Sequence, residues 1–170
     1  SASQAAIAAL AFLAIALPSE HVYVNFAAAA LLGSALGFLP HNLSRAHKIF
    51  MGDSGSLFLG FVLSALALGT DYTQRNPLGV FAPLFILLVP MYDTFFVMGV
   101  RMLKGRSPFL GSKDHFALRL ERLGCSRGQV VLASAAAAVF LGFSAFLATQ
   151  YPLREALAVY ALVAAVVFWV

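Results

Sequence analysis

The sequence has few charged residues. Of its 170 residues, 11 are Lys or Arg and 7 are Asp or Glu, so 11% are charged, against about a quarter in a typical soluble domain. Hydrophobic residues make up 61%, and the mean hydropathy is +0.88. A soluble core of this size cannot bury so much apolar surface, so the composition excludes a water-soluble globular domain and predicts an integral membrane protein.

Cysteine is also scarce, and the chain start lacks the features of a signal peptide. Cys125 is the only cysteine, which excludes an internal disulfide bond. No basic region precedes the first apolar segment, and no clear small-residue cleavage site follows it. Ser1 and Val170 both border apolar segments. We therefore expect both ends to be truncations of longer membrane helices.

The apolar residues fall into segments that predict an all-α, polytopic transmembrane bundle. A membrane-spanning helix needs about 20 residues, with a range of about 17 to 25. Six segments stand out, so we predict about six spanning helices in a single integral-membrane domain over residues 1–170, with inner loops at about 40–54 and 104–128. The segments are Ser3–Leu17, Val22–Leu39, Gly55–Gly69, Leu78–Leu103, Gln129–Thr149 and Leu157–Val170.

The basic residues predict which side of the membrane each connection faces. Of the 11 Lys and Arg residues, only Arg75 and Arg154 lie in the connections that would share one side. All the others lie in residues 40–54 and 104–128 or at the helix ends beside them. Basic residues concentrate on the cytoplasmic side of membrane proteins, so both of these longer connections should be cytoplasmic.

The first of these connections contains Asp53 at the predicted start of a helix. One interpretation is an N-cap, because an Asp at that position accepts backbone N–H bonds. The other is a Mg²⁺ ligand, because hard cations take carboxylate oxygens and often share them with substrate phosphates. Gly52 and Gly55 would allow backbone or phosphate to approach closely. The residues alone leave the two interpretations evenly balanced.

The residues around Asp53 resemble a family signature. Ile49–Gly60 reads IFMGDSGSLFLG and is similar to a motif of the polyprenyl-phosphate N-acetylhexosamine-1-phosphate transferases, of the glycosyltransferase family 4 type. The resemblance implies that Asp53 binds the catalytic Mg²⁺, with Mn²⁺ as the alternative ion. It also implies that Phe50 stacks on the uracil of the nucleotide sugar and that Asn42 lies near the nucleotide.

Asp93 is an ionisable residue at membrane depth, about ten residues before the inner end of its predicted helix. Such a residue is a candidate for function because its burial in lipid is costly. Pro90 should kink the same helix by freeing a backbone carbonyl. The alternative is that Asp93 or Thr94 braces this kink through hydrogen bonds. We favour a structural or supporting role for Asp93.

The second inner connection can form a short amphipathic helix from Asp114 onward. His115, Arg119 and Arg122 follow the i, i+4, i+7 spacing of one helix face. This face could anchor the helix among lipid headgroups. It could also hold a diphosphate, because Arg donates hydrogen bonds to phosphate oxygens. The two roles are compatible.

This connection continues the resemblance. Gly105–Phe109, Asp114-His115 and Arg119-Leu120 are similar to the loop of bacterial members that use UDP-N-acetylglucosamine. The resemblance implies that Arg106 and Arg119 bind substrate phosphate and that His115 is catalytic.

One departure from the family pattern stands in this loop. Members commonly carry a His-x-His-His cluster, whereas Ala117 and Leu118 occupy the last two of these positions here.

The resemblance, from about Gly37 to Leu132, implies a function for the parent protein. It would transfer N-acetylhexosamine-1-phosphate from a UDP-sugar to undecaprenyl phosphate in the bacterial inner membrane, for cell-envelope polysaccharide synthesis. The family's paired aspartates have no counterpart here, since the sequence contains no Asp-Asp pair, so we expect these 170 residues alone to be inactive. The partners would be both substrates and membrane lipid, with no nucleic acid. A transporter or scaffold fragment and an inactive relative are the alternatives.

Overall fold

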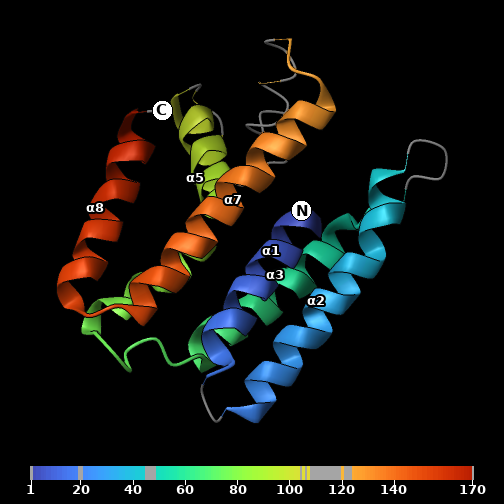
Figure 1. Ribbon diagram of the computed structural model, residues 1–170. Helices are drawn as coiled ribbons and strands as arrows, with labels where there is room; N and C mark the ends of the chain where they lie inside the picture. Colours follow the sequence, from blue (N-terminus) through green and yellow to red (C-terminus); the bar gives the residue numbers. More distant parts are fainter. Residues whose placement is uncertain are drawn as a thin grey trace.

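The computed structural model describes residues 2–18, 21–44, 49–103, 105, 107, 120 and 124–169 (Figure 1). Helices form the regular structure of these residues, and they contain no strand, which confirms the all-α class. The elements are α1 (Ala2–Ala16), α2 (Val22–Leu43), α3 (Gly52–Gly69), the short 3-10 helix η1 (Pro77–Phe81), α4 (Ala82–Ile86), α5 (Leu88–Leu103), α7 (Arg127–Gln150) and α8 (Leu153–Trp169).

The helices alternate in direction, as the predicted topology requires. α1 packs against α2, α3 and α7, and α7 packs in turn against α4 and α8. Figure 1 shows the ends of α2 and α5 and the start of α7 at one end of the bundle, and the connection from α3 to η1 at the other. We call these the inner and outer ends. The helix ends that flank both basic connections therefore lie at the same end.

The number of spans is lower than the predicted six. The described residues hold three helices long and apolar enough to cross a membrane, Val22–Leu43, Gly52–Gly69 and Gly128–Gln150, or four spans if one bent helix pair counts as a span. α1 has 15 residues and α8 has 17. At 1.5 Å per residue, α1 rises about 22 Å, less than the roughly 30 Å of a bilayer core. The polytopic class holds with a smaller count.

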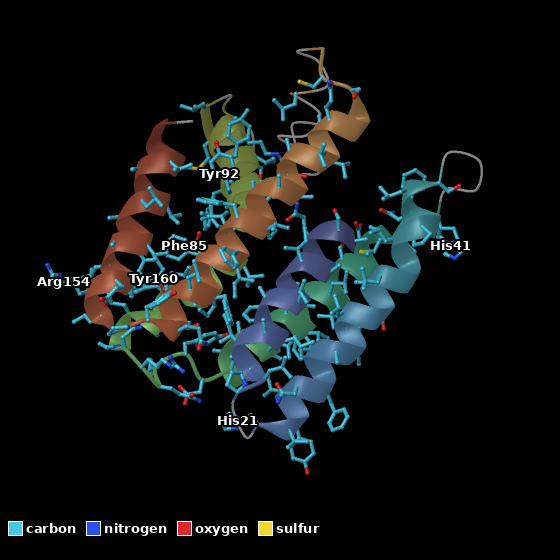
Figure 2. All side chains as sticks on the ribbon, viewed as in Figure 1. His21, His41, Phe85, Tyr92, Arg154 and Tyr160 are labelled. Atoms are coloured by element: carbon cyan, nitrogen blue, oxygen red, sulfur yellow. The ribbon has the colours of Figure 1, made fainter. Side chains whose placement is uncertain are left out.

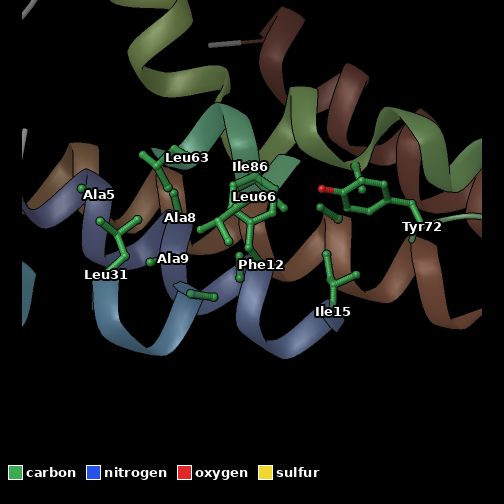
Figure 3. Packing of buried hydrophobic residues seen from close by; sticks show 14 residues of the cluster. Ala5, Ala8, Ala9, Phe12, Ile15, Leu31, Leu63, Leu66, Tyr72 and Ile86 are labelled. Atoms are coloured by element: carbon green, nitrogen blue, oxygen red, sulfur yellow. The ribbon is translucent and has the colours of Figure 1, made fainter. Parts of the chain in front are cut away.

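The core lies along α1, where alanines permit close helix contact (Figure 3). Ala is the strongest helix former and adds little bulk. Phe12 is fully buried and lies among Leu66 and Ile86 from neighbouring helices. A Cβ at Gly142 of α7 would lie 3.3 Å from the Ala11 Cβ. Small side chains therefore set the distance between α1 and α7.

The predicted helix Leu78–Leu103 is broken rather than continuous. η1 and α4 form one arm and α5 the other, with a bend of 63° between them. Pro90 has no N–H to offer the carbonyl of Ile86, four residues earlier, and the helix breaks at the next residue, Leu87. The Thr94 hydroxyl donates to the Pro90 carbonyl at 3.0 Å. The predicted kink and the brace through Thr94 are both confirmed, and Asp93 lies half-buried beside it in α5.

The outer connection from α3 to η1 is tied to the end of α7. The Asn76 side chain is 3% exposed, and its Nδ2 donates to the carbonyls of Ala148 at 2.8 Å and Tyr151 at 2.7 Å. Pro152, four residues after Ala148, cannot supply the N–H that would continue the helix. Arg75 Nη1 also donates to the Gln150 carbonyl at 2.8 Å. This connection therefore caps the carbonyls that the end of α7 leaves unpaired.

Two further contacts order the outer end. The Thr73 backbone N–H donates to Asp71 Oδ1 at 3.1 Å and lowers the pKa of this carboxyl. The Tyr72 hydroxyl donates to the Ala67 carbonyl at 2.9 Å, and burial raises the pKa of Tyr72. Gly79 is required here because a Cβ at that position would collide with the Tyr72 carbonyl.

We expect Asn76→Ala to destabilise the protein substantially. The change removes both hydrogen bonds and leaves the buried Ala148 carbonyl and the partly exposed Tyr151 carbonyl without this donor, which should cost about 2–3 kcal/mol of unfolding free energy. Asn76→Asp should have a similar effect because a carboxylate cannot donate. Thermal unfolding in detergent measures the effect, with exposed Arg154→Ala as the control. An unchanged melting temperature for both Asn76 variants would contradict the capping role.

Candidate functional site

The candidate site begins where α2 ends. His41 lies in the last turn of α2, at the opposite end of this helix from His21 (Figure 2). The next residue, Asn42, is half-buried, and its Nδ2 donates to the Ile49 carbonyl at 3.0 Å. The Ile49 N–H donates to the His41 carbonyl at 3.1 Å. The chain thus returns to the end of α2 directly before the residues of the predicted site.

Asp53 lies in the first turn of α3 and is not its N-cap. Met51 precedes the first helical residue, Gly52, and contributes no side-chain capping bond. Gly52 has a φ of +68°, a backbone conformation that other residues avoid. The N-cap interpretation of Asp53 is therefore wrong, because the left-handed turn at Gly52 starts the helix one residue before Asp53. A carboxylate in this turn remains favourable beside the positive end of the helix dipole.

The side chains around Asp53 leave it open to solvent. Asp53 is exposed, and Phe50 is 77% exposed. A Cβ at Gly55 would lie 2.6 Å from Met51 Cγ, so the Met51 side chain packs against the first turn at the point where Gly55 leaves room. Phe50 and Asp53 therefore flank a packed Met51 and both reach solvent at the inner end.

The structure brings three of the predicted site residues to one connection. Asn42, Phe50 and Asp53 all lie between the last turn of α2 and the first turn of α3. Arg106, His115 and Arg119 lie outside the described residues, as do Ala117 and Leu118. The first three residues therefore lie around one connection in the structure. The contribution of the second inner connection stays a prediction.

Arg101 is a residue of the inner end that the site prediction left out. It lies in the last turn of α5 and is only 7% exposed. A buried guanidinium requires compensating partners, and a cation near a helix C-terminus interacts favourably with the helix dipole. The amphipathic pattern of α5 could have identified Arg101. Arg101 places a positive charge at the end of α5, directly before the second basic connection.

The surroundings of Asp53 suit a Mg²⁺ ion that is bound together with substrate. Within the described residues, no three His, Cys, Asp or Glu side chains are grouped closely enough to hold a metal ion. A single exposed carboxylate is nevertheless suited to Mg²⁺, which keeps several waters and commonly takes one or two carboxylates together with substrate phosphates. Asp53 therefore fits a metal ion whose other ligands are waters and substrate phosphates.

Fold and site together define a class of protein. The chain is a multi-helix membrane protein whose chemically capable side chains gather in a polar connection at one end of the bundle. Residues 1–71 match the model of glycosyl transferase family 4. This match covers α1, α2 and α3 and begins further upstream than the motif resemblance, which started at Gly37.

Curated relatives extend this similarity. The chain is 40% identical over 113 residues to the decaprenyl-phosphate N-acetylglucosaminephosphotransferase of Mycobacterium leprae, covering 60% of this chain and 28% of the relative. A probable undecaprenyl-phosphate N-acetylglucosaminyl 1-phosphate transferase of Bacillus subtilis is 37% identical over 118 residues, 69% of this chain and 33% of the relative. The undecaprenyl-phosphate alpha-N-acetylglucosaminyl 1-phosphate transferase of Escherichia coli is 33% identical over 114 residues, 65% and 31%.

These relatives confirm the resemblance predicted from the motifs. The chain is similar to polyprenyl-phosphate N-acetylglucosamine-1-phosphate transferases. It spans about a third of the length of the curated relatives described above. No solved structure matches it significantly.

Proposed function

We propose that the parent protein transfers N-acetylhexosamine-1-phosphate from a UDP-sugar to undecaprenyl phosphate, giving a lipid-diphosphate-sugar and UMP. The observation on which the proposal rests is the exposed Asp53 in the first turn of α3, near the exposed Phe50. Both residues lie in the region that matches the model of glycosyl transferase family 4. A sugar-phosphate donor and a polyprenyl phosphate are also the substrate classes that the relatives' names contain.

The chain's own side chains would bind and orient the donor. Asp53 would hold Mg²⁺, or Mn²⁺ as the alternative, which supplies neutralisation of the diphosphate charge when bound. Phe50 would stack on the uracil ring, and Asn42 would contribute near the nucleotide. The phosphate charge would be held by side chains of the second inner connection, which are Arg106, His115 and Arg119.

Two other functions are weaker explanations. A transporter or membrane-scaffold fragment accounts for the apolar helices and basic connections. Transporters, however, place substrate-binding groups near the middle of the membrane, whereas Asp53 and Phe50 lie at a helix end. An inactive relative is favoured only by Ala117 and Leu118, which replace two histidines of the family pattern.

An assay of the full-length protein tests the proposal. Membranes containing it should convert labelled UDP-N-acetylglucosamine and undecaprenyl phosphate to a labelled lipid-diphosphate-sugar in the presence of Mg²⁺, and release UMP. A full-length protein that binds UDP-sugar without turnover would favour the inactive relative. One that moves a solute across vesicles without forming this product would favour the transporter.

We also propose that the inner end faces the cytoplasm of a bacterial inner membrane. The basic residues concentrate in the two connections of the sequence whose flanking helix ends lie at this end, as positive-inside topology requires. Cysteines introduced at Ser44 and Ser112, on a Cys125→Ser background, should resist an impermeant thiol reagent in intact cells and react after permeabilisation. A cysteine introduced at Thr73, on the outer connection, is the control and should label in intact cells. Ready labelling of both inner positions would reverse the orientation.

A further inference from the structure

The connection between α2 and α3 is closed by hydrogen bonds at its base. α2 ends where the Ser44 N–H donates to the Pro40 carbonyl at 3.0 Å. The chain then returns at Ile49, whose N–H donates to the His41 carbonyl at 3.1 Å and whose carbonyl accepts from Asn42 Nδ2 at 3.0 Å. Both backbone polar groups of Ile49 are thus bound by two consecutive residues of α2.

The chemistry of these groups fixes the role of each one. A backbone carbonyl only accepts hydrogen bonds, so the Asn42 nitrogen and not its oxygen must face Ile49. The His41 carbonyl is among the last four of α2, which have no partner inside the helix, and Ile49 supplies the missing donor. The Asn42 amide is therefore the one side chain in this clamp, which consists of His41, Asn42 and Ile49.

The clamp lies one residue before Phe50 and four before Asp53. Beyond it, the left-handed turn at Gly52 and the packing of Met51 against Gly55 hold the start of α3. The segment from Ile49 to Gly52 is too short to absorb a shift of Ile49 without moving Phe50, since each residue spans at most about 3.6 Å. The position of Ile49 thus determines where Phe50 and Asp53 lie relative to α2.

We infer that Asn42 is a positioning residue, which acts on the site through the Ile49 carbonyl and does not need to touch the nucleotide. The inference rests on the proposed function for the roles of Phe50 and Asp53, but the clamp itself does not. It reassigns Asn42 from the substrate-binding role that the resemblance implied. It also predicts that losing the amide donor opens the connection even when no substrate is present.

Limited trypsin digestion of the substrate-free full-length protein tests the clamp. Arg45 and Lys48 supply cleavage sites between Asn42 and Ile49 in the sequence, and mass spectrometry separates these cuts from all others. Asn42→Asp keeps the size of the side chain but replaces the donor with an oxygen that repels the Ile49 carbonyl. We expect cleavage after residues 45 and 48 to become about three- to ten-fold faster, the factor for one net hydrogen bond.

Two matched variants complete the design. Asn42→His presents an Nδ1–H at a similar reach and should restore cleavage to near the wild-type rate. His41→Gln changes an exposed neighbouring side chain while leaving its backbone carbonyl in the clamp, and should also behave as wild type. Equal cleavage of the wild type and Asn42→Asp would overturn the inference. So would failure of Asn42→His to protect the connection while the protein remains monodisperse.

Steady-state kinetics on the same proteins separate positioning from substrate contact. A positioning role predicts that Asn42→Asp lowers kcat through a displaced Asp53 and raises the KM for UDP-sugar through a displaced Phe50, together with the faster cleavage. A raised KM with unchanged kcat and cleavage would identify a nucleotide ligand and overturn the inference, as would faster cleavage with unchanged kcat. A wild-type protein without transferase activity would count against the proposed function alone, because the digestion still decides the clamp.

Discussion

Asp53→Asn in the full-length protein should abolish most transferase activity and leave membrane expression intact. The amide keeps the shape of the side chain but removes the negative charge that would hold Mg²⁺ against the donor diphosphate. A metal contribution of several kcal/mol to transition-state stabilisation corresponds to a loss of about 100- to 1,000-fold in kcat. Because Asp53 is exposed in the first turn of α3, the substitution should cost little stability. Product formation at several Mg²⁺ concentrations measures the effect.

The outer end of the bundle provides the matched control for this substitution. Asp71→Asn makes the same chemical change in the connection from α3 to η1, at the opposite end of α3 from Asp53. It should leave turnover near the wild-type rate. If Asp53→Asn retains near wild-type turnover at low Mg²⁺, Asp53 is not a metal ligand. Its place in the first turn would then reflect only its favourable interaction with the helix dipole.

His115→Ala should lower transfer strongly, by about 100-fold or more if His115 takes part in proton transfer or in stabilising the developing charge. No neighbouring histidine can replace it, because Ala117 and Leu118 occupy the positions of the other two histidines in the family pattern that the sequence resembles. Arg119→Ala should instead act mainly on the KM for UDP-sugar, raising it about ten-fold. A phosphate contact that is equally strong in ground and transition states lowers KM without changing kcat.

The competing explanation for this connection is an interfacial anchor. In that case His115→Ala and Arg119→Ala would both weaken membrane packing slightly and leave both kinetic constants nearly unchanged. Arg154→Ala, which removes a basic residue from the outer end, is the control for general loss of positive charge. Small, equal effects of all three substitutions would show that the connection lies outside the site and would favour a divergent relative.

The candidate site was predictable where its residues are close in sequence. Phe50 and Asp53 lie within four positions, so any turn into α3 keeps them together, and the motif alone brought them to the same helix start. The role of Asn42 was less predictable. Its partner Ile49 lies seven positions later, and local propensity does not determine a contact at that separation. The N-cap interpretation of Asp53, one of two that the residues left evenly balanced, is wrong because α3 begins at Gly52 with a positive φ, which the sequence permits but does not require.

Composition and periodicity by themselves determined that this chain is an all-α membrane protein, because apolar segments with internally paired backbones are the stable form in lipid. The distribution of Lys and Arg likewise determined which connections share an end, and Pro90 determined that its helix breaks. Only the tertiary structure decided that the break bends by 63° and that Asn76 caps α7 across 72 and 75 positions of sequence. Contacts between such distant residues depend on how packed helices meet, which local pattern does not specify. The hydrogen bond from Asn42 to Ile49 was likewise decided by the tertiary structure. The sequence does not specify which carbonyl the Asn42 amide meets, because only folding brings the Ile49 carbonyl within its reach.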